Sequence, residues 1–319
     1  MKLAKSLTVA AALSLAASTS AMAADAKVAI SDLNWTGAKA IGHVIQAIIT
    51  GPMGSEAEIV KGLSDQAIIG AGMDKGDGSA DVWTDMWMPN QQGPWDKYIV
   101  ENKTVDHNTP YLGTQQMYVP SYMSDKIKSF DDLKNPEIAA MFDKDGNGKG
   151  EYWAGDASWK STKIWQVKMK SYGLSELWEP EIISDATFKA QLKSAVGNQK
   201  PILFYYWTPE WIHAAYDITP LSEPAHSEGC MELKLDQEDW LEASKAGCKT
   251  PDAKVYVSFS KSLEKRNPAA AKMLKNMQLD PATVNGWILK IGRDEQDPQD
   301  VAEEWVNSNM DTVKKWIDG

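Results

Sequence analysis

The stretch KVAISDLNWTGAKAIGHVIQAIIT (27–50) decides the fold class, because a strand pattern passes directly into a helix pattern. Residues Lys27 to Asp32 alternate and predict a first strand. Residues Gly37 to Thr50 repeat apolar side chains at helical spacing and predict an amphipathic helix. Strand and helix patterns alternate along the rest of the chain as well, which predicts an α/β fold.

The remaining elements are predicted from apolar periodicity and from the turn residues that flank them. Strands are expected at 80–83, 115–119, 201–207 and 255–260. Helices are expected at 65–73, 135–142, 158–171, 187–196, 268–277, 281–291 and 298–316. No repeat and no low-complexity linker in the sequence marks a domain boundary.

Charge and the first residues bear on where the protein works. The 319 residues carry a formal net charge of −11, which excludes the basic surface that nucleic-acid binding requires. Residues 1–23 combine a basic start, an apolar run too short to span a bilayer and the small-x-small pattern Ala21-Met22-Ala23. This pattern predicts a secretory signal peptide, so we expect an exported, soluble protein.

The chain contains two cysteines, Cys230 and Cys248. In an exported protein an isolated pair usually forms a disulfide. Such a bond would close a loop of about 19 residues and contribute roughly 3 kcal/mol through loop entropy. Metal binding is a weaker alternative because no histidine is found at ligand spacing, and free thiols are the third.

Fourteen tryptophans are unusual, and several lie in short polar, turn-prone segments. Indole is the strongest natural cation–π acceptor, and a quaternary ammonium, which cannot donate a hydrogen bond, is held by π faces and dispersion. The alternative is that the tryptophans fill the core. Trp87 and Trp207 follow predicted strands and Trp159 begins a predicted helix. Open α/β sheets bind ligands at such positions, which favours an aromatic cage.

Four stretches resemble the periplasmic substrate-binding proteins of ABC importers for quaternary amines, of the glycine betaine/choline type. They are ADVWTDMWMPN (80–90), NPEIAAMFDKDGNGKGEYWAG (135–155), DASWKS (156–161) and KPILFYYWTPEW (200–211). The resemblance implies a periplasmic binding protein fold, type II-like, with two α/β lobes, a hinge and a ligand cleft between them. Lobe 1 is expected to comprise residues 24–114 plus 222–319, and lobe 2 residues 115–221.

In that family three tryptophans form a box around the trimethylammonium group. Matching motifs assign this role to Trp87, Trp159 and Trp207, with Trp35 as a fourth wall and Trp211 as a further candidate. The resemblance implies that Trp87 lies on one lobe and the other two box residues on the second, so that closure completes the cage. It also implies a monomer that is not an enzyme and delivers its ligand to an ABC permease in the inner membrane.

The chain departs from the betaine-binding pattern near the second box tryptophan. Trp159 is flanked by Ser158 and Lys160 instead of glycines, and the loop 88–91 after Trp87 holds neither arginine nor histidine for a ligand carboxylate. A smaller trimethylated ligand without a carboxylate fits this loss. We therefore favour trimethylamine N-oxide as the ligand, with glycine betaine and choline as alternatives.

Other polar residues give weaker indications. Asp85 and Asp156 would attract the methyl face of a cationic ligand, although a solvated surface is the default interpretation for both. The four histidines are scattered without zinc-site spacing: His43, His107, His213 and His226. The sequence contains no nucleophile elbow, no P-loop and no dinucleotide-binding fingerprint.

The segment DKDGNGKGE (143–151) spaces oxygen donors like the first nine positions of a calcium loop. The candidate ligands are the side chains of Asp143, Asp145, Asn147 and Glu151 and the carbonyl of Lys149. Ala154 at position 12 cannot supply the usual bidentate carboxylate, so an outside donor or water would be needed. The alternative is a metal-free turn; bound Ca²⁺ would have a structural role, pinning the loop before Trp159.

Two rival functions stay open. Tryptophan platforms also stack on sugar rings, and Asp/Glu pairs cleave glycosidic bonds, so an exported carbohydrate-binding or carbohydrate-hydrolysing protein is one rival. A calcium-dependent structural or adhesion module is the other.

Overall fold

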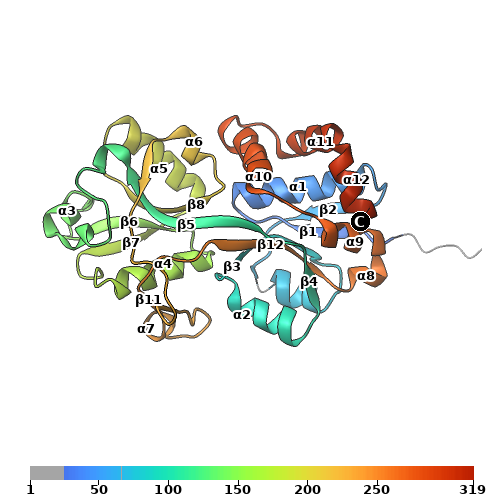
Figure 1. The fold of residues 1–319 in the computed structure, drawn as a ribbon, viewed down its shortest axis with the longest axis horizontal. Coiled ribbons are helices and arrows are strands. Elements are labelled where there is room, and N and C mark those ends of the chain that lie inside the picture. Colours follow the sequence, from blue (N-terminus) through green and yellow to red (C-terminus); the bar gives the residue numbers. More distant parts are fainter. Residues whose placement is uncertain (1–24, 66) are drawn as a thin grey trace, which may run out of the picture.

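The computed structural model describes residues 25–319 except residue 66, and these residues form two α/β lobes lying side by side (Figure 1). The predicted α/β two-lobe fold is confirmed. The predicted secretory signal, residues 1–23, lies outside the described residues. Within the described part of the chain, no helix is both long and apolar enough to cross a bilayer.

Lobe 1, on the right in Figure 1, contains the first and last parts of the described chain. Its strands are β1 (Val28–Ser31), β2 (Ala57–Val60), β3 (Val82–Met88) and β4 (Val105–His107). Its N-terminal helical elements are α1 (Thr36–Thr50), the π-helix η1 (Ala67–Asp74), α2 (Gln92–Pro94) and η2 (Trp95–Glu101). Its C-terminal ones are α8 (Leu263–Arg266), α9 (Pro268–Asn276), α10 (Pro281–Ile288), η5 (Leu289–Arg293), α11 (Pro298–Ser308) and α12 (Met310–Asp318).

Lobe 2 contains the middle of the chain. Its strands are β6 (Gly150–Gly155), β7 (Trp178–Ile182), β8 (Leu203–Thr208), β9 (Ile218–Pro220), β10 (Met231–Glu232) and β11 (Lys245–Ala246). Its helical elements are η3 (Ser121–Met123), η4 (Asp132–Lys134), α3 (Pro136–Ala140), α4 (Lys160–Ser171), α5 (Asp185–Gly197), α6 (Ile212–Ala215) and α7 (Trp240–Ala243).

Two long strands, β5 (Tyr111–Pro120) and β12 (Ala253–Ser260), run between the lobes (Figure 1). They join both halves into one path of paired strands, β2-β1-β3-β12-β5-β8-β6-β7. Strand β12 pairs antiparallel with β3 and with the first residues of β5, up to Gly113. From Thr114 onward β5 pairs with β8 instead. The chain therefore changes lobe at Gly113–Thr114, beside the boundary predicted after residue 114.

The return crossing differs from the sequence-based expectation, which placed every residue from 222 onward in lobe 1. The structure packs β10, α7 and β11 against α4 of lobe 2, with Ile164 and Val167 of α4 contacting Leu235 and Ala246. The buried ammonium of Lys168 in α4 also donates to the carbonyl of Cys248 at 2.7 Å. The chain thus returns to lobe 1 along β12, because apolar contacts keep the preceding segment on lobe 2.

The C-terminal helix also differs. The sequence predicts one helix over 298–316, whereas the structure has α11 and α12, with Asn309 in a non-helical conformation between them. The side chain of Asn309 donates to the carbonyl of Trp305 at 2.8 Å, which satisfies one of the last carbonyls of α11. Asparagine tolerates such a break because its amide competes with the backbone for hydrogen bonds.

Candidate ligand-binding site

A cavity of about 600 Å³ lies between the lobes, and four tryptophans line it. Two come from lobe 1, Trp35 and Trp87, and two from lobe 2, Trp159 and Trp207. We call these four residues the tryptophan cage. The structure thus brings together indoles that lie far apart in the sequence, on the two sides of one cleft.

The lobe-1 half of the cage depends on the alternation of strand β3. Successive side chains of a strand point to opposite faces, so Trp83, Asp85 and Trp87 share one face, and all three line the cavity. Trp35 comes from the loop between β1 and α1 and is the residue immediately before the first turn of α1. The indole N–H groups of Trp35 and Trp87 both donate to one oxygen of Asp85, at 2.6 and 3.0 Å.

Asp85 is buried, contrary to the solvated position taken as the default from the sequence. Its side chain is 1% exposed, and its second carboxylate oxygen accepts a hydrogen bond from the hydroxyl of Tyr111 at 2.6 Å. Burial raises the pKa of Asp85, while the hydrogen bonds from Trp35, Tyr111 and Trp87 oppose that rise. The alternating pattern WTDMW was the sequence signal that could have placed this carboxylate beside Trp87.

Trp87 needs space that a glycine supplies. A Cβ at Gly113 of β5 would lie 2.6 and 2.7 Å from atoms of the Trp87 ring and 2.7 Å from the carbonyl oxygen of Thr208. Contacts this short do not occur in relaxed structures, so a side chain at position 113 would displace the indole. Gly113 lies where β5 leaves lobe 1, so the strand that joins the lobes also seats a cage residue.

The lobe-2 half of the cage is held by other aromatic rings. The rings of Trp159 and Trp207 meet edge to face, with centroids 5.1 Å apart and planes at 84°. Trp207 stacks on Tyr206 at 4.2 Å and 12°, and Trp159 meets Trp153 edge to face at 5.8 Å. Both arrangements suit the aromatic quadrupole, so these indoles are fixed without a charged partner.

The two halves touch across the cleft. The indole N–H of Trp159 donates to the side-chain oxygen of Asn34 at 2.7 Å, and the Asn34 amide donates to Ser158 at 3.3 Å. The rings of Trp35 and Trp159 meet edge to face with centroids 6.0 Å apart. These contacts join the loop after β1 in lobe 1 to the start of α4 in lobe 2. The two lobes therefore contact each other at the edge of the cavity.

Trp211 lies outside the cavity. The ammonium of Lys189 lies 5.5 Å from the centre of its ring, and the ring packs against Gly292 of η5. The residues that line the cavity do not include it. Trp211 was a candidate because it follows Trp207 closely in sequence. Strand β8, which holds Trp207, ends at Thr208, and Trp211 lies after that end, immediately before α6.

The cations of the cavity are three lysines, and the residues lining it in the described chain include no arginine and no histidine. Lys160 forms an ion pair with Asp236. Lys163 donates to the carbonyl of Leu235 at 2.8 Å. Lys39, the third, has no ion pair or side-chain hydrogen bond within residues 25–319, residue 66 set aside.

The predicted calcium loop gathers its acids in space. Oxygens of Asp143, Asp145 and Glu151 lie within 4.8 Å of one another. The Asp143 carboxylate accepts hydrogen bonds from the backbone N–H groups of residues 146, 147 and 148, at 2.7, 3.2 and 2.9 Å. The amide of Asn147 donates to Glu179 of β7 at 2.8 Å, which brings a carboxylate from outside the loop next to it.

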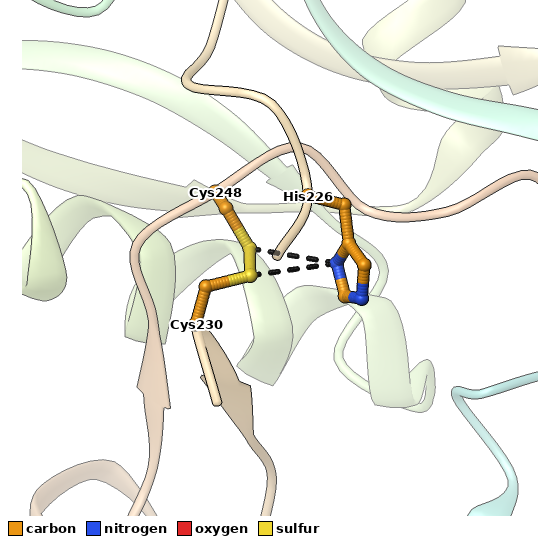
Figure 2. Close-up of side chains that lie close together, drawn as sticks. All are labelled: His226, Cys230 and Cys248. Atoms are coloured by element: carbon orange, nitrogen blue, oxygen red, sulfur yellow. Dashed lines mark hydrogen bonds between the residues drawn. A yellow bond between two sulfur atoms is a disulfide. The ribbon is translucent and has the colours of Figure 1, made fainter. Parts of the chain in front are cut away.

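The two cysteines form the predicted disulfide, with Cα atoms 5.9 Å apart. Figure 2 shows His226 beside it: its Nδ1 lies 3.4 Å from the sulfur of Cys230 and 3.6 Å from that of Cys248. The sequence-based statement that no histidine lies at ligand spacing was therefore wrong. Both sulfurs are spent in the disulfide, so the three residues do not present the thiolates that a zinc site needs.

The sequence as a whole matches a known family. A family profile described as the substrate-binding domain of ABC-type glycine betaine transport systems covers residues 26–308. The chain belongs to this family.

Curated relatives of this family agree. The glycine betaine-binding periplasmic protein OusX of Dickeya dadantii is 25% identical over 198 residues, 60% of this chain and 59% of that protein. The glycine betaine/proline betaine-binding periplasmic protein of Escherichia coli is 26% identical over 228 residues, 69% of this chain and 62% of that protein. The chain thus spans about six-tenths of the length of these relatives.

Solved structures of the family share the fold. ProX from Borrelia burgdorferi superposes with a TM-score of 0.72 at 21% identity, covering 92% of this chain and 97% of that one. A choline-binding protein in complex with choline gives 0.71 at 20% identity, covering 92% of both chains. Lactococcal OpuAC with glycine betaine gives 0.70 at 21% identity, covering 92% of this chain and 100% of that one.

Proposed function

We propose that this chain is the substrate-binding protein of an ABC importer and captures a small trimethylated amine in the tryptophan cage. The observation that carries this proposal is the convergence of four indoles, two from each lobe, on one cavity. Indole faces replace water around the methyl groups of a quaternary head, and each desolvated contact is worth roughly 2 kcal/mol. The family match supports an amine and not a sugar as the ligand.

The other end of the ligand decides which amine is bound. A carboxylate ligand such as glycine betaine needs a cation or backbone amides, and two of the three cavity lysines are engaged by Asp236 and Leu235. Lys39 is the cation left for a carboxylate. A single free lysine, with no arginine or histidine among the described residues of the lining, is a poorer carboxylate site than that ligand needs. We therefore propose trimethylamine N-oxide, which has no carboxylate, with glycine betaine and choline as the alternative ligands.

The N-oxide oxygen needs a donor. Three cage indoles have already spent their N–H groups, on Asp85 and on Asn34. Trp207 is the cage residue whose indole N–H has no partner among the described residues, and the hydroxyl of Ser161 also lines the cavity. We assign the contact with the ligand oxygen to one of these two groups.

The ligand proposal is tested by calorimetric titration of the purified protein with trimethylamine N-oxide, choline and glycine betaine. We expect the N-oxide to bind most tightly. Trp159→Ala and Trp207→Ala should each weaken binding about 10- to 100-fold, because each removes one cage wall. Unchanged affinity of both variants for every methylated amine would show that the cage assignment is wrong.

A matched variant separates the candidate ligands. Lys39→Met keeps the length of the side chain and removes its charge, so affinity for trimethylamine N-oxide and choline should change less than that for glycine betaine. If glycine betaine binds most tightly and Lys39→Met weakens it selectively, glycine betaine is the ligand. A thermal shift with oligosaccharides and none with amines would favour the carbohydrate rival instead.

The proposed setting follows from the same family. We propose that the protein works as a monomer in the periplasm, without enzymatic activity, and hands its ligand to an ABC permease in the inner membrane. Closure of two lobes over a ligand gives the permease a changed surface to recognise.

We also propose structural Ca²⁺ on the loop that holds Asp143, Asp145, Asn147, Lys149 and Glu151. Hard oxygen donors on a tightly turned backbone suit this ion, and Glu179 is the neighbouring carboxylate that would replace the missing donor at position 12. Elemental analysis of protein purified without added metal, with melting in calcium and in chelator, tests it. No bound calcium and no stabilisation by calcium would support the metal-free turn.

A further inference from the structure

We infer that Asp85 is the counter-ion of the tryptophan cage: it orients two of the four indoles and makes the site select a positively charged head over a neutral one of the same shape. This inference rests on the proposed function, because it concerns the same cavity. It adds the field of a carboxylate to the charge selectivity that the cation–π contacts of the cage already provide.

The hydrogen bonds of Asp85 point to this role. Two of its three donors are indole N–H groups of cage residues, Trp35 at 2.6 Å and Trp87 at 3.0 Å, and the third is the hydroxyl of Tyr111 at 2.6 Å. Trp35 comes from a loop and Trp87 from a strand, so the carboxylate ties together two indoles from different elements. With three donors on two oxygens it acts as an acceptor, which is the behaviour of an ionised carboxylate.

The charge of Asp85 is not neutralised by a side chain of the described chain. No lysine, arginine or histidine within residues 25–319, residue 66 aside, forms an ion pair with it, although its side chain is 1% exposed and lines the cavity. Buried carboxylates are normally paired, because desolvating a lone charge is costly. A ligand that brings a positive charge into the cavity supplies the missing partner.

Two other buried carboxylates, Asp81 and Glu210, lack this arrangement. Asp81, just before the same strand, is buried but pairs with Arg266. Glu210 is buried but pairs with Lys189 at 3.1 Å. Asp85 therefore differs from these two carboxylates in two ways. Its hydrogen-bond donors are two indoles and a phenol in place of a cation, and it lies on the cavity wall.

The test compares two ligands of one shape. Choline carries a positive nitrogen, whereas 3,3-dimethyl-1-butanol has carbon in its place and is neutral. Asp85→Asn retains a side-chain oxygen as an acceptor but removes the charge. We expect it to weaken choline binding about 10- to 100-fold and to leave binding of the neutral alcohol within about threefold. An equal loss for both ligands would show a structural role only and overturn the inference.

Tyr111→Phe is the second variant, for use if Asp85→Asn does not fold. It keeps the charge and removes one donor to the ionised form, so it raises the pKa of Asp85. The titratable groups around the carboxylate are Tyr111, which donates to it, and Asp32, Lys39 and Asp65, which line the same cavity. As the solution is acidified, choline affinity should therefore begin to fall at a higher pH in the variant than in the wild type. Affinity for the neutral alcohol should not change over the same pH range.

The outcomes separate this inference from the proposed function. A wild-type protein that binds no methylated amine contradicts the proposed function itself. A wild-type protein that binds choline, with an unchanged ratio of choline to alcohol affinity in Asp85→Asn and an unshifted pH profile in Tyr111→Phe, contradicts the counter-ion alone.

Discussion

In the lobe-1 half of the tryptophan cage the indoles donate hydrogen bonds to a buried carboxylate, whereas in the lobe-2 half they are held by contacts with other aromatic rings. Trp35 and Trp87 donate to Asp85, and Trp207 stacks on Tyr206. Lobe 2 also has a buried carboxylate near its half, Glu210, but that group is paired with a lysine. The difference is between a buried carboxylate that a lysine pairs within the fold, Glu210, and one, Asp85, whose partner we propose to be the ligand.

The largest effect is expected from Gly113→Ala, which should break the lobe-1 half without touching its hydrogen-bonding groups. The added methyl would overlap the Trp87 ring and the Thr208 carbonyl, so the indole must move out of the cage. We expect a loss of affinity of about 100-fold in calorimetry and a destabilisation of about 1–3 kcal/mol in urea unfolding.

Gly286→Ala is the matched control for Gly113→Ala. Gly286 is exposed in α10, and a Cβ there would have nothing within 4 Å. Alanine should leave affinity unchanged and stabilise the helix by about 0.5–1 kcal/mol. Wild-type affinity in Gly113→Ala would contradict the placement of Trp87 in the cage.

A smaller effect is expected at the contact that joins the halves. Asn34→Ala removes the acceptor for the Trp159 N–H, and a hydrogen bond of this kind contributes about 1 kcal/mol, so ligand affinity should fall about fivefold. Asn34→Asp retains an acceptor oxygen and should lie closer to wild type. Calorimetry measures both; an Asn34→Ala affinity equal to that of the wild type would mean that this bond does not stabilise the ligand-bound state.

The smallest effect is expected from Glu210→Gln and concerns stability. Burial raises the pKa of Glu210 from 4.5 to about 7. The folded protein therefore holds this proton more tightly than the unfolded chain, so the contribution of Glu210 to the unfolding free energy declines as pH rises from about 4.5 to about 7. Urea unfolding from pH 5 to 8 should show the wild type losing stability relative to the variant across that range.

Glu210→Gln also sharpens the contrast with Asp85. The ratio of choline to 3,3-dimethyl-1-butanol affinity should stay at the wild-type value, because Glu210 lies outside the cavity lining and is paired with Lys189. A pH-independent stability difference, or a changed ligand ratio, would show that the two buried carboxylates do not divide their roles in this way.

Much of the fold was predictable because its main elements have strong periodicity. The strand at 27–32 and the helix at 37–50 correspond to β1 and α1 within a residue or two. Strands β6 and β7 were missed because the first follows a glycine-rich turn and the second carries a proline. The formation of such strands depends on pairing with segments that are distant in sequence. Strand β6 pairs in parallel with both β7 and β8, and no local sequence pattern predicts those pairings.

The site was predictable in its aromatic residues and not in its polar ones. Strand exits and family motifs indicated Trp87, Trp159 and Trp207, and the structure places all three on one cavity. Asp85 and Asn34 act through partners 50 and 125 residues away in the chain, which a linear pattern does not reveal. Trp211 shows the opposite error, because nearness in sequence to Trp207 does not put it in the same pocket.

The most direct measurement is calorimetric titration with tetramethylammonium, a ligand that is nothing but methyl groups around a charged nitrogen. The wild type should bind it, and Trp35→Ala, from lobe 1, and Trp159→Ala, from lobe 2, should each weaken binding at least tenfold. Binding that survives the loss of either indole unchanged, or no binding of tetramethylammonium by a protein that does bind another trimethylated amine, would contradict a cage closed by both lobes.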